Sequence, residues 1–278
     1  MKRSIFLLLA SCCLSSPSIA HDFWVEPQSF QMEAPEDITV SIMIGHPEDQ
    51  MYWPMNPHRV ISFKSYGPAG IRDHQSSLDA QNSKGEQRLS LTTMGTHILS
   101  IETTSAKSVL AAEKFNRYVE EEGLTPIQRQ RDSKNMTGKP GREIYSRRGK
   151  ALIQVGTRHK CSETADHVHY YDHVTTPLGM TLEIVPNQNP YHLESQAPFE
   201  ATIYYRGKPT EGVTVGLISL DTTEGVIASK VSDNTGKVVF PRPDKGDWML
   251  HAVWSDPLEE NIEAEFDTIF SSLSFGFN

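Results

Sequence analysis

Short runs of alternating apolar and polar residues dominate the first hundred positions. The clearest lie at residues 38–44, 60–63 and 95–101, and Pro, Gly, Asp or Asn bound them. Alternation with a period of two puts one face of a strand against a core and the other face in solvent. The pattern therefore predicts half-buried antiparallel strands from about residue 21 to residue 104.

The period changes after residue 107. Apolar residues recur at helical spacing from Leu110 to Val119. Gly123 follows where a helix usually closes in a left-handed conformation, with Leu124 placed to pack back against it. These features predict one α-helix near residues 108–122.

The segment 129–150 is strongly basic. It holds eight Lys or Arg against two acids, together with Gly138, Pro140 and Gly141. This composition predicts an exposed basic loop, either a solvated segment that balances an acidic body or a patch for acidic lipid or a partner. A strand pattern follows at residues 151–156.

The remainder of the chain, from residue 178 to residue 278, is again strand-like. Alternating runs recur about every 10–15 residues, and turn sequences at 207–209 and 232–236 separate them. This rhythm is typical of a sandwich and resembles prealbumin-like and immunoglobulin-like modules. We expect an all-β protein of two β-sandwich domains, residues 21–177 and 178–278, with one α-helix inserted in the first. Such folds carry no function by themselves.

The first 20 residues have the pattern of a secretory signal peptide. A basic start at Lys2 and Arg3 precedes an apolar core at residues 5–10, and small residues stand at the cleavage position, 18–20. Cleavage there makes His21 the first residue of the mature chain. No later run of about 18 apolar residues exists, so we expect a periplasmic protein whose mature chain has no transmembrane segment.

A second processing site competes with this one. Residues 9–12 resemble a lipoprotein cleavage box, and cleavage there would lipidate Cys12 and leave His21 within a short tether. The apolar core ahead of Cys12 is very short, which favours cleavage before His21. A lipid anchor through Cys12 is the alternative.

Composition narrows the classes of partner. The net charge is −9, and it becomes −11 once Lys2 and Arg3 leave with the signal, so nucleic acid is a poor partner. Of the three cysteines, Cys12 and Cys13 leave with the signal and only Cys161 stays. The mature chain then has no internal disulfide, and the fold rests on its core.

Catalytic and nucleotide-binding motifs are absent from the sequence. It contains no Gly-x-Ser-x-Gly, no Gly-x-x-x-x-Gly-Lys, no Gly-x-Gly-x-x-Gly after a strand pattern and no His-Glu-x-x-His. We therefore expect a protein that is not an enzyme.

Histidine is the remaining chemical signal, with eleven residues in the chain. A mature N-terminal His21 offers a metal its α-amine and its Nδ1, and one further imidazole completes the three-nitrogen site called a histidine brace. Copper(II) and nickel(II) favour such planar nitrogen sets. His46, at the end of one strand pattern, and His97, in another, are the candidate partners. The alternative is that both are ordinary hydrogen-bonded histidines at strand ends.

A second candidate site lies between residues 159 and 173. His167 and His169 are two residues apart, so on an extended strand both rings project from one face and can approach one ion. The alternative is a histidine-rich surface loop.

Several motifs together resemble one known family. They are HDFW after the signal, Gly45-His46-Pro47, the segment 113–124, YSRRGKALI at 145–153 and LEIVP at 182–186. They are similar to a family of bacterial exported proteins of unknown function that is labelled as a periplasmic component of cobalt/nickel transport. The resemblance covers nearly all of the mature chain and implies a divalent metal handled in the periplasm. His21 and His46 match positions where that family commonly has His.

These observations lead to one expectation and two alternatives. We expect a periplasmic protein that binds nickel, cobalt or copper for uptake or buffering, through His21, His46 and His97 and a second site at His167 and His169. Its partners would be the metal ion and a membrane metal transporter or another envelope protein. The alternatives are a non-catalytic two-domain protein-binding scaffold and a copper oxidoreductase built on a histidine brace.

Overall fold

The computed structural model describes residues 22–78, 85–156, 173–194, 196–259 and 263–278. Its strands form a central ten-stranded sheet and two four-stranded sheets. The all-β, sandwich-type class expected from the alternating patterns is confirmed. In the described residues, no helix is long and apolar enough to cross a membrane.

The central sheet runs in the order β15–β14–β17–β18–β10–β8–β5–β6, and β2 and β9 also pair with β10. The bounds of its strands are β2 Gln31–Met32, β5 Val60–Gly67, β6 Gly70–Asp73, β8 Gly95–Thr103, β9 Ala106–Leu110, β10 Gly141–Val155, β14 Thr214–Ser219, β15 Val226–Val231, β17 Gly246–Pro257 and β18 Phe266–Phe277. The middle of the sheet is a parallel pair of long strands, β10 and β18. The segments 21–177 and 178–278 therefore share one sheet.

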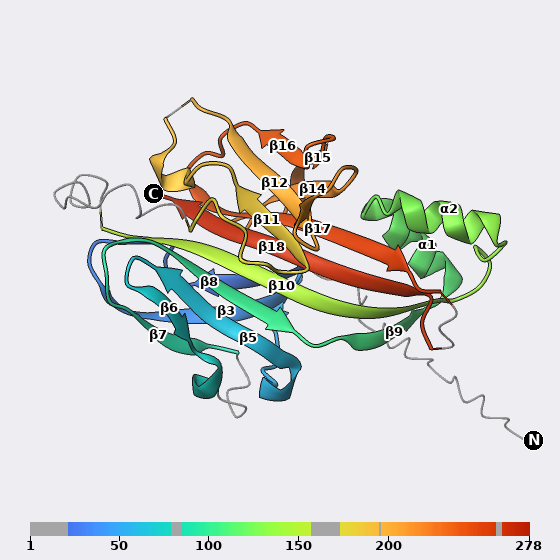
Figure 1. Ribbon diagram of the computed structural model, residues 1–278, viewed down its shortest axis with the longest axis horizontal. Coiled ribbons are helices and arrows are strands. Elements are labelled where there is room, and N and C mark those ends of the chain that lie inside the picture. Colours follow the sequence, from blue (N-terminus) through green and yellow to red (C-terminus); the bar gives the residue numbers. More distant parts are fainter. Residues whose placement is uncertain (1–21, 79–84, 157–172, 195, 260–262) are drawn as a thin grey trace, which may run out of the picture.

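The two small sheets cover opposite faces of the central one. The first consists of β1 Asp22–Pro27, β3 Glu36–Gly45, β4 Met51–Tyr52 and β7 Gln87–Leu91. The second consists of β11 Leu182–Pro186, β12 Phe199–Tyr205, β13 Lys208–Pro209 and β16 Lys237–Phe240. Figure 1 shows β11, β12 and β16 on one side of the long pair β10–β18 and β3 and β7 on the other.

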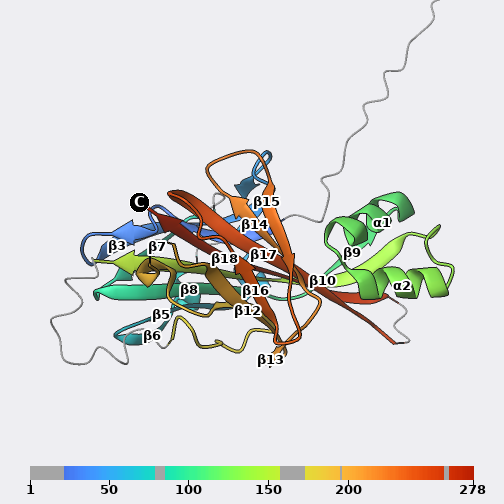
Figure 2. The same ribbon diagram turned by 90° about the horizontal axis from the view of Figure 1, so that it is seen from above.

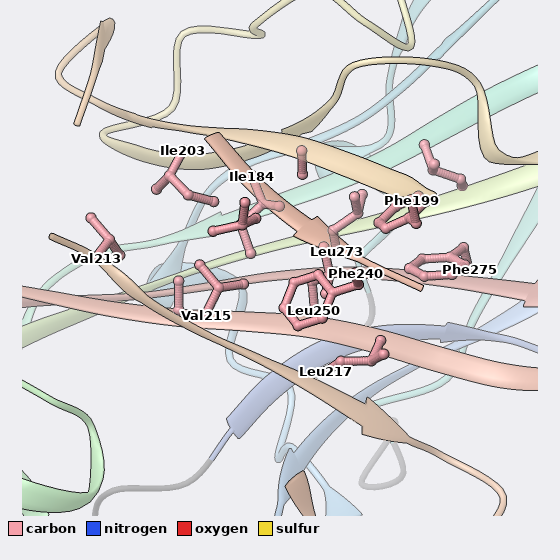
Figure 3. Close-up of a cluster of buried hydrophobic side chains, with 14 of the residues drawn as sticks. Ile184, Phe199, Ile203, Val213, Val215, Leu217, Phe240, Leu250, Leu273 and Phe275 are labelled. Atoms are coloured by element: carbon pink, nitrogen blue, oxygen red, sulfur yellow. The ribbon is translucent and has the colours of Figure 1, made fainter. Parts of the chain in front are cut away.

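The strand period explains this three-layer arrangement. Neighbouring residues of one strand point to opposite faces. Ile98 and Leu152 lie in the core under β11, β12 and β16, whereas Leu99 and Ile153 lie in the core under β1, β3 and β7. Figure 3 shows the first of these cores, in which Phe199 and Phe240 meet Leu250 and Phe275.

Two helices and three short 3-10 turns complete the described fold. The helices are α1 Ala112–Glu121 and α2 Thr125–Ser133, and the turns are η1 Pro57–Arg59, η2 Gln75–Ser77 and η3 Pro190–His192. Both helices lie at one end of β10 and β18, opposite the C-terminus (Figures 1 and 2). Gly123 closes α1 at φ +65°, as its position predicts, and Leu124 is buried beneath it.

The start of the predicted helix is wrong. Residues 108–110 belong to β9, which pairs with β10, and α1 begins at Ala112. Leu110 contributes to the core that α1 covers, but it does so from a strand. The helical spacing of Leu110 therefore led to a wrong prediction for its backbone.

The predicted basic loop at 129–150 is wrong except at residues 134–140, which lie outside helices and strands and are largely exposed. Its first residues belong to α2, and residues from Gly141 onward form β10. Three basic side chains of β10 are buried, and each has a specific neighbour. Lys150 Nζ lies 2.8 Å from Glu183 Oε1, Arg148 Nε lies 3.0 Å from Glu102 Oε2, and the Arg147 guanidinium stacks 4.6 Å from the Tyr145 ring. Composition alone does not reveal such long-range partners.

Candidate functional site: a buried histidine–carboxylate cluster

The first described residue, Asp22, has a buried carboxylate that lies between two imidazoles. His251 Nδ1 is 2.9 Å from Asp22 Oδ1, and His46 Nδ1 is 3.6 Å from Asp22 Oδ2. On its other side, His251 Nε2 lies 3.4 Å from Glu122 Oε2. We call these four residues, Asp22, His46, Glu122 and His251, the Asp22 cluster.

Four segments that are distant in the sequence supply the cluster. Asp22 opens β1 and pairs with Gly45, so His46 follows directly at the end of β3. Glu122 is the C-terminal cap of α1. His251 lies on β17 opposite Gly216 of β14. The cluster therefore lies where β1, the end of β3 and the end of α1 meet β17 of the central sheet.

Two glycines make room for this arrangement. A Cβ on Gly216 would lie 2.9 Å from His251 Cδ2, closer than packed side chains allow. A Cβ on Gly149, in β10, would lie 3.3 Å from Val25 Cγ2 and 3.4 Å from Phe23 Cε1. Glycine at position 149 thus lets β1 approach β10, and glycine at position 216 lets the His251 ring lie against β14.

The electrostatics of the cluster make His251 a buried cation. Burial alone would lower its pKa, but Asp22 and Glu122 raise it to about 9. Burial would raise the pKa of Asp22, but His251 and His46 hold it well below its ordinary value. The pKa of His46 is raised by its contact with Asp22, and burial raises the pKa of Glu122. At neutral pH, an imidazolium therefore sits between two carboxyl groups.

The described members of the cluster offer few donors to a metal ion. Both nitrogens of His251 face carboxylates, and the Asp22 carboxylate contacts both imidazoles. A first-row transition metal commonly takes three or four protein ligands. Across the described ranges, no group of three or more His, Cys, Asp or Glu side chains is placed to hold a metal ion.

The structure places the sequence-predicted histidines differently. His46 belongs to the cluster, while His21, His167 and His169 lie outside the described residues. His97 is buried in β8, where its Nε2 lies 2.8 Å from the Thr93 carbonyl oxygen. His97 pairs with Ile153 of β10. His251 pairs with Ser272 of β18, which in turn pairs with Gly149 of β10. Four residues along β10 and three strand spacings then separate the two rings by roughly 20 Å, so His97 is not part of the cluster.

Three members of the cluster, Asp22, Glu122 and His251, were not predicted from the sequence. His251 stands in an alternating run between Leu250 and Ala252, which reads as an ordinary strand. The signal that could have identified His251 is a histidine at a strand position whose side chain faces the protein interior. Glu122 ends a helix rich in acids, and nothing local distinguishes it from Glu120 or Glu121.

The architecture and the cluster define a class: an all-β sandwich-type protein with a buried histidine–carboxylate site at the start of its first strand. The chain belongs to the family described as Domain of unknown function (DUF4198), whose model matches residues 18–256. No curated protein matches the chain.

Solved structures share only distant similarity with it. The D0-D1 domain of Intimin is 11% identical with a TM-score of 0.19, and the match covers 91% of this chain and 97% of that one. The fibronectin(III)-like modules of Clostridium thermocellum CbhA are 9% identical with a TM-score of 0.19, covering 90% and 93%. Escherichia coli alpha-2-macroglobulin domains MG0-NIE-MG1 are 10% identical with a TM-score of 0.21, covering 87% and 96%.

Proposed function

We propose that the protein is a periplasmic carrier or buffer of a divalent transition metal, nickel, cobalt or copper, and that it binds the ion at the start of β1. The observation that supports this most is the contact between His46 Nδ1 and Asp22 Oδ2, at 3.6 Å. Asp22 is the second residue of the chain that cleavage after Ala20 would produce. The new N-terminus would then lie next to an imidazole.

The donor chemistry fits this proposal. Metal-bound histidines usually donate their second ring N–H to a carboxylate, which fixes the ring and raises its basicity. Asp22 stands in that position relative to His46, and in this arrangement Nε2 of His46 is the ligand atom. The side chain of His46 is 38% exposed, so an ion can reach it from solvent.

The remaining donors would come from His21. Its Cα lies about 3.8 Å from that of Asp22 through their shared peptide bond. Its α-amine and Nδ1, together with His46, would supply the three nitrogens that copper(II) and nickel(II) favour. His251 and Glu122 would hold the Asp22 carboxylate in place without binding the ion. Delivery to a membrane transporter or another envelope protein then needs no catalytic step.

Native mass spectrometry of protein recovered from the periplasm tests the chain start and the metal together. We expect a mass that begins at His21 and one ion bound after titration with nickel, cobalt, copper or zinc. His46→Ala should weaken binding by at least about 100-fold, because loss of an outer-shell partner alone costs about 10- to 100-fold. His58→Ala, an exposed histidine on η1, is the matched control. A lipidated Cys12, or equal affinity in both variants, would contradict the proposal.

His167 and His169 are proposed as a second, weaker site. The double substitution His167→Ala/His169→Ala should lower the number of bound ions without changing the affinity of the first site. Isothermal titration calorimetry separates the two effects. An unchanged stoichiometry would assign these histidines to the surface-loop alternative.

A protein-binding scaffold is the second candidate, and one observation favours it. Strand β15 is an edge of the central sheet, and Val226, Ile227 and Val231 on it are exposed. Edge strands with exposed apolar residues are ready to pair with another chain. A scaffold predicts no ion bound more tightly than about micromolar, so the same titration distinguishes the two functions.

A further inference from the structure

A pocket opens at the end of the central sheet that is farthest from the helices. Its volume is about 430 Å³, within the usual range for small-molecule sites. Met32, Tyr191 and Phe277 form apolar walls, and Gln31, His192 and Arg242 add polar groups. The C-terminus marks this end in Figure 1. Met32 belongs to the core on one face of the central sheet and Phe277 to the core on the other, so the pocket lies where the three sheets meet.

Arg242 is the unusual member of this lining. Its guanidinium lies 4.6 Å from the centre of the Phe277 ring. Arg148 and Lys150 each pair with a carboxylate, but among the described residues Arg242 has neither an ion pair nor a hydrogen-bond acceptor. A guanidinium stacked on a ring keeps the N–H groups on its edge available for an anion. The described residues therefore hold this cation in place without neutralising it.

The pocket walls are fixed before any ligand arrives. Tyr191 donates a hydrogen bond from its hydroxyl to the Leu152 carbonyl oxygen at 2.6 Å, and its ring meets Phe277 edge to face at 6.2 Å. Pro241 and Pro243 flank Arg242 and restrict its backbone. Such preorganisation lowers the entropy cost of binding.

We infer that this pocket binds a small organic monocarboxylate, whose carboxylate pairs with Arg242 while its apolar body packs against Met32, Tyr191 and Phe277. A planar carboxylate matches the two-pronged geometry of the guanidinium. The exposed Glu33 also lines the pocket, and its negative charge disfavours phosphate and other dianions. One guanidinium and apolar walls fit a ligand that has one negative charge and an apolar body.

This site is separate from the Asp22 cluster. His251 pairs with Ser272 of β18, and Phe277 lies five residues further along that strand, roughly 17 Å away. The inference therefore stands independently of the proposed metal function. The second ligand of this protein would be an organic carboxylate, not a metal ion.

Calorimetric titration with 3-phenylpropionate, on the full mature protein, tests the inference. We expect binding, and a much weaker interaction with the neutral isostere 3-phenylpropionamide. Arg242→Gln should reduce the affinity about ten- to a hundred-fold, the range expected for a charge-assisted hydrogen bond. Arg206→Gln is the matched control, because Arg206 also stacks on a ring, that of Tyr205 at 4.9 Å, but lies on the surface near Asp256.

Three outcomes would overturn the inference. They are no binding of 3-phenylpropionate at about 10 mM, equal affinity for the acid and the amide, and equal loss of affinity in the two arginine variants. Arg242→Lys keeps the charge without the planar fork and should fall between the wild type and Arg242→Gln. Thermal unfolding of each variant without ligand shows whether a lost affinity reflects the pocket or the fold.

Discussion

His97 and His251 both lie on the central sheet with little exposure to solvent, 5% and 13%, and their pKa values shift in opposite directions. The His251 ring lies between Asp22 and Glu122, and its pKa rises to about 9. The His97 ring faces the Thr93 carbonyl, and burial lowers its pKa. The comparison teaches that the carboxylates a fold delivers, and not burial itself, decide whether a buried imidazole carries charge.

The largest expected effect comes from removing the carboxylate that His251 relies on. Asp22→Asn leaves the imidazolium of His251 with Glu122 alone. Breaking a buried ion pair in this way costs about 3–5 kcal/mol of unfolding free energy. Urea denaturation at pH 7 measures the loss.

The matched control for this substitution is Asp37→Asn. Asp37 lies 3.2 Å from Arg88, but both side chains are exposed, and such surface pairs are worth less than about 1 kcal/mol. Similar losses in the two variants would mean that the Asp22 cluster contributes no more than a surface pair.

The second effect is the pH dependence that His251 adds. Its pKa in the folded state, about 9, exceeds its ordinary value of 6.5. The stabilisation is therefore fully present below pH 6.5 and disappears as the pH rises through 9, and it amounts to about 3 kcal/mol. Denaturation curves at several pH values should show this loss in the wild type and not in His251→Gln. Parallel pH profiles for the two proteins would exclude a charged His251.

The smallest effect belongs to His97 and has the opposite sign. Its pKa is lowered in the folded state, so the unfolded chain takes up a proton first as the pH falls. Between pH 7 and 5 the wild type should lose more stability than His97→Gln. NMR titration of the ring protons checks this directly: His97 should stay neutral at a pH where His251 is protonated. A protonated His97 at pH 6.5 would remove the contrast.

The sequence predicts those parts of the fold that depend on local patterns. The alternation at 38–44 and 95–101 corresponds to β3 and β8, and Gly123 ends α1 as expected. Each of these signals is contained in a few neighbouring residues. The second helix, α2, escapes prediction because only Ile127 and Arg131 of its residues are buried, which gives no apolar stripe.

The candidate site was predictable only in part. His46 stands out in the sequence because it ends a strand pattern, but its partners are set by long-range pairing. Asp22 and His251 are more than two hundred positions apart and meet only after β1 packs over β17 and β18. Similarly, the basic character of 129–150 concealed a buried strand, because Glu183 and Glu102 lie in other elements.

The parallel pairing of β10 with β18 also governs how the chain reaches this structure. Glu143 pairs with Phe266 and Ala151 with Ser274, so the middle of the central sheet joins segments about 120 residues apart. Contacts of such long sequence separation must close a large loop before they stabilise anything, and they slow folding. Until β18 arrives, β10 and β17 each present an unpaired edge to other chains. The folding chain is therefore most prone to aggregation just before β18 pairs with β10 and β17.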